Sequence, residues 1–119
     1  MRILLALIMI AHGVAHLPGF LVSWRLASLA DLPYRTTVFA GRLDLGDGGI
    51  RAMGVVWLAL ALAFAAAGVG LLLESPWWGT VARAAIVVSL IACTAALPET
   101  RIGVLANIAL AAWLVWLRR

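Results

Sequence analysis

Four apolar segments follow one another along the chain, and only short polar stretches separate most of them. Each segment is close to the roughly 20 residues that a helix needs to cross the hydrocarbon core of a bilayer. The pattern predicts membrane-spanning helices over Ile3–Trp24, Ala52–Leu73, Trp77–Leu97 and Ile102–Leu117. The last segment is the shortest, but its tryptophans and terminal arginines are typical of an anchor at the membrane interface.

The connections between these segments predict how the helices are arranged. Glu74–Pro76 and Pro98–Arg101 are tight turns, so the helices that they join should be antiparallel neighbours. Arg25–Arg51 is the one long connection; we expect a short helical turn over Leu26–Leu32 and a sharp turn at Gly46–Gly49. The expected fold is therefore all-α: a single domain, residues 1–119, forming an integral membrane, up-down-up-down four-helix bundle with one longer loop between its first two helices.

The composition supports a location in the membrane and argues against nucleic acid as a partner. Of the 119 residues, 66% are hydrophobic and 12% are charged, and a soluble domain of this size could not cover so much apolar surface. The basic residues are nine arginines, which are scattered singly except for Arg118–Arg119. A nucleic-acid-binding protein would carry them as a patch or stripe. Contact with lipid headgroups accounts for them instead.

The arginines are almost equally divided between the two sides of the membrane, so they give little information about the orientation of the chain. The expected topology places four arginines beside the termini and five on the side of the long loop, namely Arg2, Arg83, Arg118 and Arg119 against Arg25, Arg35, Arg42, Arg51 and Arg101. The positive-inside rule does not decide between such similar counts. Arg2 and the Arg118–Arg119 pair lie closest to helix ends, which favours termini in the cytoplasm.

Two histidines in the first apolar segment are the most specific chemical feature of the chain. His12 and His16 are one helical turn apart, so both rings lie on the same face of a helix. A polar side chain within the bilayer must face protein, a ligand or trapped water, and it marks a candidate functional site. Pro18 follows closely and removes a backbone donor, which predicts a kink between the histidines and Gly19.

Helical rise predicts that polar groups from all four helices share a similar depth. Counted from the loop side, His16 and Ser89 lie roughly 13 Å deep, and Trp57 and Asn107 roughly 9 Å deep. His12 lies roughly 6 Å below His16, near the middle of the bilayer. We therefore expect a pocket that opens toward the long loop, lined by His12, His16, Trp57, Ser89 and Asn107, with Glu99 and Arg101 at its rim.

Several interpretations of this polar layer remain open. Its members could simply hydrogen-bond across helices. His12 and His16 could chelate a metal, but a third ligand would have to come from Glu99, Cys93 or an aspartate of the loop. A b-type haem needs axial ligands on opposite faces, which one helix supplies only in an oligomer. Proton transfer or binding of a quinone, isoprenoid or lipid headgroup also fits. No motif identifies a cofactor.

The chain resembles a family of small bacterial four-helix membrane proteins that share the motif HGxxHLxGF in their first helix. The motif is matched here by His12, Gly13, His16, Leu17, Gly19 and Phe20. Further matches in the other helices are Gly54, Trp57, Leu58, Trp77, Trp78, Ser89, Gly103, Ala106 and Asn107. The overall plan also resembles, more loosely, that of DoxX-type proteins. The resemblance implies a four-helix fold and a bacterial inner membrane, but this family has no settled activity to carry over.

These observations predict a membrane protein that binds a small hydrophobic or amphiphilic molecule, or a metal, in its polar pocket. One alternative is an accessory subunit whose polar layer packs against a larger membrane complex. Another is a lipid or quinone enzyme in which His16 acts as an acid–base group. Membrane lipid is the expected neighbour, and small residues such as Ala66 and Gly70 predict either close packing inside the bundle or a homo-oligomer seam.

Overall fold

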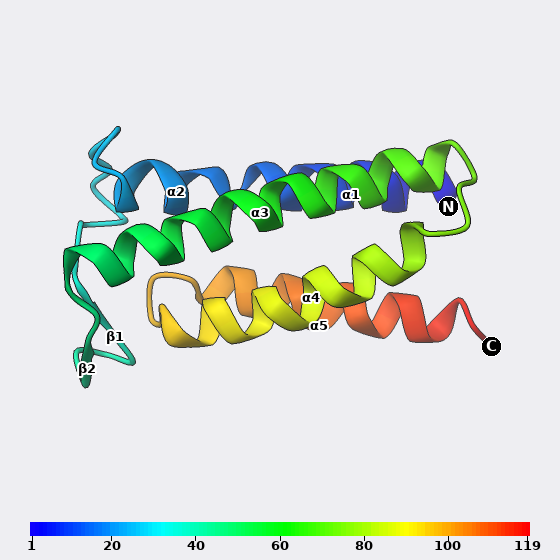
Figure 1. The fold of residues 1–119 in the computed structure, drawn as a ribbon. Helices are drawn as coiled ribbons and strands as arrows, with labels where there is room; N and C mark the ends of the chain where they lie inside the picture. The colour runs from blue at the N-terminus through cyan, green and yellow to red at the C-terminus, as the bar shows by residue number, and fades with distance from the viewer.

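The computed structural model describes residues 1–119 and is almost entirely helical (Figure 1). Two short strands form a hairpin between the second and third helices. In chain order the elements are α1 (Arg2–Val14), α2 (Leu17–Ser23), β1 (Thr37–Val38), β2 (Leu43–Asp44), α3 (Gly46–Leu72), α4 (Trp78–Ala95) and α5 (Arg101–Trp116).

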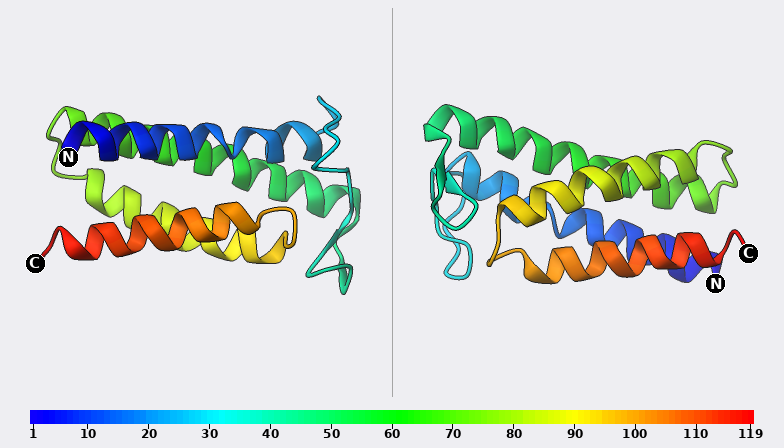
Figure 2. Two further views of the ribbon diagram at one scale, coloured as in Figure 1. Left: turned by 180° about the vertical axis from the view of Figure 1, so that it is seen from behind. Right: turned by 90° about the horizontal axis from the view of Figure 1, so that it is seen from below.

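The helices form four rods that alternate in direction. α1 and α2 follow one another along the first rod, and α3, α4 and α5 are the other three. Both termini lie at one end of the molecule and the β-hairpin lies at the other (Figure 2). The closely packed pairs are α1 with α3, α2 with α3, α3 with α4, and α4 with α5. The long axis measures 42 Å, enough to cross the roughly 30 Å hydrocarbon core of a bilayer.

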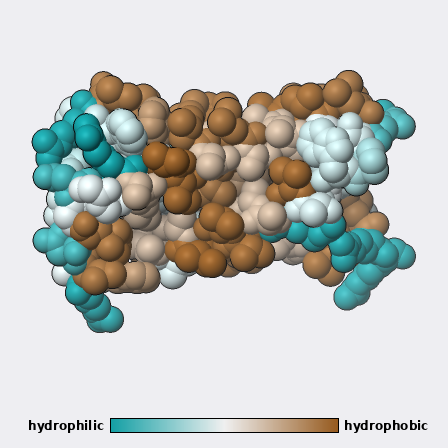
Figure 3. Space-filling view, viewed as in Figure 1, coloured by the Kyte–Doolittle hydropathy of each residue, from teal (hydrophilic) through white to brown (hydrophobic).

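The face of the molecule seen in Figure 3 is mainly apolar over its middle and polar at both ends. Three helical stretches are long and apolar enough to cross a membrane, namely Arg2–Ser23, Gly46–Leu72 and Trp78–Ala95. Arg101–Trp116 is a shorter apolar helix. Large apolar side chains such as Leu62 and Ile91 are more than 60% exposed. By composition, the chain is a membrane protein.

The first predicted helix is divided in two, and the break lies at Ala15–His16, slightly before the kink predicted between the histidines and Gly19. α1 ends at Val14 and α2 begins at Leu17, with Pro18 in its first turn. Pro18 has no N–H, so it cannot donate to the carbonyl of Val14. At the break, the N–H of His16 donates to the carbonyl of Gly13 over 3.0 Å, three residues back instead of four.

The predicted start of the second membrane-spanning helix needs correction. α3 begins at Gly46, not at Ala52, because the turn uses a single residue with φ +68° and the chain is helical immediately afterwards. The N–H of Gly46 donates to Oδ1 of Asp44 over 2.9 Å. This hydrogen bond, assisted by Thr36, holds the pKa of the Asp44 carboxyl below its ordinary value.

The prediction of a helical turn over Leu26–Leu32 is wrong. Leu29 and Leu32 instead form an isolated β-bridge, and Pro33 disfavours helical backbone at the residue before it. After the bridge, β1 and β2 pair in antiparallel fashion. The N–H of Phe39 donates to the carbonyl of Ala95 over 2.8 Å, which ties the hairpin to the end of α4.

Small residues of α3 are used for packing inside the molecule. A Cβ on Gly68 would lie 2.8 Å from the carbonyl oxygen of Ala6, and one on Gly70 would lie 2.8 Å from the Trp77 ring. Both glycines are buried. They permit α1 and the start of α4 to approach α3 closely, around fully buried side chains such as Phe64 and Met9.

Candidate functional site

The predicted polar residues of three helices form one closed ring of hydrogen bonds. His12 Nε2 lies 3.3 Å from Asn107 Oδ1, and Asn107 Nδ2 lies 2.8 Å from Ser89 Oγ. Ser89 Oγ lies 2.8 Å from His16 Nε2, and His16 Nδ1 returns to the carbonyl oxygen of His12 over 2.7 Å. Depth counting therefore placed His16, Ser89 and Asn107 correctly in one layer. Depth counting placed His12 one helical turn deeper than these residues, whereas in the structure His12 also bonds to Asn107.

The chemistry of the partners fixes the direction of each hydrogen bond in the ring. A charged imidazole is disfavoured in the hydrocarbon region, so each histidine carries one N–H. The carbonyl of His12 can only accept, so His16 donates from Nδ1 and accepts at Nε2 from the Ser89 hydroxyl. Asn107 Nδ2 also donates to the carbonyl of Gly103 over 2.8 Å, which fixes the orientation of the amide. Its Oδ1 then accepts from Nε2–H of His12.

Aromatic side chains of α3 hold the two imidazoles in place. The ring of Phe64 stacks on His16 at 5.3 Å and meets His12 edge-on at 4.7 Å. Trp57 lies 5.7 Å from the His16 ring, and its own position depends on Gly19, where a Cβ would lie 2.8 Å from the indole. Glycine at this position of the HGxxHLxGF motif therefore leaves room for Trp57.

A cavity of about 550 Å³ lies on the loop side of this ring. His12, His16 and Trp57 line it, while Ser89 and Asn107 are completely buried behind them. Its walls come from α2, the first turns of α3 and α5, the last turn of α4 and the loop that follows α2. α2 and α5 do not form one of the closely packed pairs, so the cavity separates them.

The rim of the cavity carries an ion pair. Glu99 lines the cavity and forms an ion pair with Arg35, whose Nη1 lies 2.7 Å from Glu99 Oε1. The Glu99 side chain is only 18% exposed, so the pair is partly shielded from solvent. Arg101, the other expected rim residue, is exposed at the start of α5 and does not line the cavity. Arg35 of the loop takes the position at the rim that the sequence assigned to Arg101.

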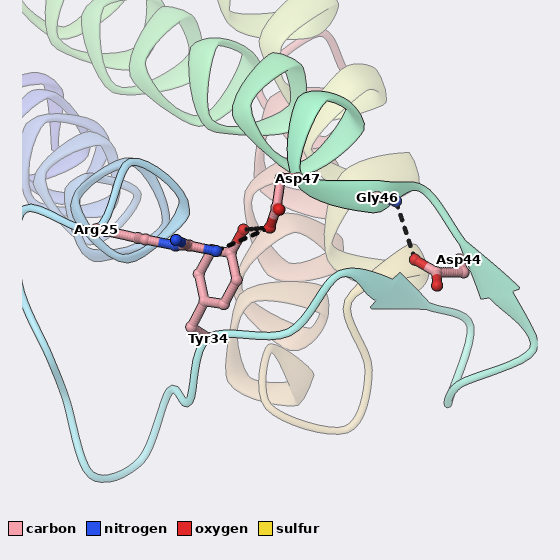
Figure 4. Close-up of polar contacts among 5 residues, drawn as sticks. All are labelled: Arg25, Tyr34, Asp44, Gly46 and Asp47. Carbon is pink, nitrogen blue, oxygen red and sulfur yellow. Dashed lines mark hydrogen bonds and ion pairs between the residues drawn. The ribbon is translucent and has the colours of Figure 1, made fainter.

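The loop that covers the cavity is fixed by a second polar cluster (Figure 4). Asp47, in the first turn of α3, accepts from Arg25 Nη2 at 2.9 Å and from the hydroxyl of Tyr34. The Arg25 guanidinium also lies over the Tyr34 ring, 4.4 Å from its centre. Tyr34, followed by Asp47, raises the pKa of Arg25 above its ordinary value.

Sequence reasoning missed the contribution of this loop to the site. Tyr34, Arg35 and Val38 all line the cavity. The only available signal was the length of the connection, because long loops often carry function. No periodicity in it indicated which side chains would turn inward.

No group of three or more His, Cys, Asp or Glu side chains comes together in a way that could hold a metal ion. The expected third ligands are directed elsewhere. Glu99 pairs with Arg35, and Cys93 lies 3.8 Å from Ser89 Oγ in the core. The ring therefore presents the chemistry of neutral hydrogen-bonding groups.

Comparisons with known proteins give no relative on which function could be based. No family model matches the chain, and neither does a curated protein or a solved structure. The resemblance carried by the HGxxHLxGF motif stays a prediction. A function must therefore be argued from the geometry of the cavity.

Proposed function

We propose that this chain is an integral membrane protein that binds one small amphiphilic molecule in the cavity between α2 and α5. The observation that carries the proposal is a cavity of about 550 Å³ with polar groups at both ends. Ligand sites for small organic molecules fall in the range of about 300–1,000 Å³. A long membrane lipid would place only its headgroup or part of a chain in such a space.

The walls favour a molecule with an apolar body. Besides the ion pair and the histidines, hydrophobic residues make up more than half of the lining and include Ala15, Leu29, Ile102 and Ala106. A purely polar solute would lose its hydration along this stretch without gaining partners. An amphiphile would bury its apolar part there and direct polar groups to the ion pair and to the histidines.

In the membrane we propose a bundle of four helices. α5 is the shortest of the four rods; its 16 residues span about 24 Å. Trp116 and Arg118–Arg119 extend it to the interface at the terminal end. We place the termini in the cytoplasm of a bacterial cell, since Arg2 and the terminal pair lie closest to helix ends. The cavity then opens on the outer side of the inner membrane.

Filling the cavity is expected to abolish binding. In Ala106→Phe, the new ring would occupy cavity space from the wall formed by α5. We expect at least tenfold less bound amphiphile than in the wild type, measured by native mass spectrometry and organic extraction after purification in detergent. Ala109→Phe is the matched control: Ala109 lies on α5 but is exposed and outside the cavity.

The same measurement separates the proposal from its alternatives. Equal amounts of amphiphile in both variants would contradict binding in this cavity. A partner protein purified in fixed stoichiometry without any small molecule would favour an accessory subunit. A bound molecule that only the wild type converts, and His16→Gln does not, would favour a lipid or quinone enzyme.

A further inference from the structure

One ring nitrogen of the histidine pair is free to accept a hydrogen bond. His16 uses both of its nitrogens, toward His12 and toward Ser89. His12 uses Nε2 toward Asn107, and its Nδ1 makes no hydrogen bond. Because Nε2 carries the proton, Nδ1 of His12 has an unshared lone pair and can only accept.

This nitrogen is accessible and not sealed in the core. No buried side-chain nitrogen or oxygen lacks a partner in this molecule, so an unpartnered Nδ1 must retain accessible surface. His12 is half-buried and lines the cavity. An unpaired acceptor is unfavourable within hydrocarbon, and it persists where a ligand or water completes it.

The ring also prevents the imidazole from adapting to a different ligand. Exchanging the tautomer of His12 would remove the proton from Nε2 and place two acceptors, Nε2 and Asn107 Oδ1, against each other at 3.3 Å. Rotating the Asn107 amide would break its hydrogen bonds to Ser89 and to the Gly103 carbonyl. The acceptor character of Nδ1 is therefore built into the fold.

We propose that the ligand of this cavity carries a hydroxyl or N–H group at its inner end and donates it to Nδ1 of His12. The proposal rests on the proposed function, since it concerns the same cavity. It selects alcohols, phenols and amides over ethers, esters and quinones of similar size, whose oxygens can only accept. The carbonyl of a quinone would meet a lone pair at this position, whereas the hydroxyl of the corresponding quinol would bond to it.

A matched pair of probes tests this selection. Binding of para-octylphenol and of its methyl ether is measured in one detergent by titration calorimetry. We expect the ratio of phenol affinity to ether affinity to be about tenfold higher in wild type than in His12→Gln, since one neutral hydrogen bond of this kind contributes about that factor. Glutamine can keep a donor toward Asn107 but lacks Nδ1. Comparing ratios between proteins cancels the different partition of the probes into micelles.

Ala109→Phe is the control variant, because Ala109 is exposed on α5 and lies outside the cavity; it should keep the preference of wild type for the phenol. If His12→Gln does not fold, Asn107→Leu decides, because without Asn107 Oδ1 the proton of His12 is no longer held on Nε2. A lower ratio of phenol affinity to ether affinity than in wild type would support the donor requirement, and an unchanged ratio would overturn it. If both probes bind and the ratio of phenol affinity to ether affinity is the same in wild type and in His12→Gln, the inference is overturned, while the cavity remains a binding site. Binding of neither probe, together with no effect of Ala106→Phe on bound amphiphile, would instead overturn the proposed function.

Discussion

Replacing Asn107 with leucine is expected to destabilise the folded protein by about 2 kcal/mol. The amide makes three hydrogen bonds, to His12, Ser89 and the Gly103 carbonyl, and is completely buried. Leucine has nearly the same shape but leaves Nε2–H of His12 without an acceptor. The burial of leucine offsets only part of this penalty. Reversible unfolding in mixed detergent micelles, followed by circular dichroism, measures the difference.

The closed ring of hydrogen bonds also predicts that the effects of two variants on stability are not additive. Asn107→Leu and Ser89→Ala remove links of one network, so the double variant should be more stable than the sum of the single effects by about 1 kcal/mol. Interhelical hydrogen bonds in membrane proteins couple by only about 0.6 kcal/mol on average. Thr94→Val, an exposed change on α4, should stay within about 0.5 kcal/mol of wild type. Strict additivity of the two ring variants would contradict a closed ring.

The helices could be predicted from the sequence because apolar runs of this length have few alternatives. Three of the four predicted segments differ from the observed helices by one or two residues at their ends or by a proline break. The start of α3 could not be predicted in the same way. Gly46–Gly49 has the composition of a turn, yet only Gly46 takes a positive φ, and Asp47 to Gly49 form the first helical turn.

The polar ring could be predicted in depth but not in connectivity. Antiparallel helices and a fixed rise place His16 and Ser89 at one level, and they are bonded. The break before α2 changes the rise and rotation of the chain at Ala15–His16, so counting along a straight helix misplaced His12 relative to Asn107. Of the interpretations that the sequence left open, hydrogen bonding across helices applies to Ser89 and Asn107, and the two histidines also line the cavity.

The rim could not be predicted because it is made by tertiary contacts of an irregular segment. Arg35 reaches Glu99, which is distant in sequence, because the hairpin is tied to α4 and Tyr34 is held by Asp47. Arg101 was the nearest arginine to Glu99 in sequence. In an irregular loop, sequence distance says little about which side chain turns inward.

Adding one methyl group to Gly13 is expected to destabilise the protein by about 2 kcal/mol, although the same change elsewhere should stabilise it. The Cβ of Gly13→Ala would lie 2.7 Å from the carbonyl oxygen of Ala61 and 3.0 Å from the Cβ of Phe64. The nearest atom belongs to backbone, so α1 must move away from α3. This movement would also displace the Phe64 ring from the histidines that it holds.

Gly48→Ala is the matched substitution, because a Cβ on Gly48 meets nothing within 4 Å and the residue is in the first turn of α3. Alanine there reduces the freedom of the unfolded chain and should stabilise the protein by up to about 1 kcal/mol. The two glycine-to-alanine variants are therefore expected to shift the unfolding free energy in opposite directions in one assay. Stabilisation of the protein by both substitutions would show that α1 does not approach α3 through Gly13. Lower amphiphile content in Gly13→Ala, with wild-type content in Gly48→Ala, would connect this close contact to the site, because the helix that approaches through Gly13 also carries His12.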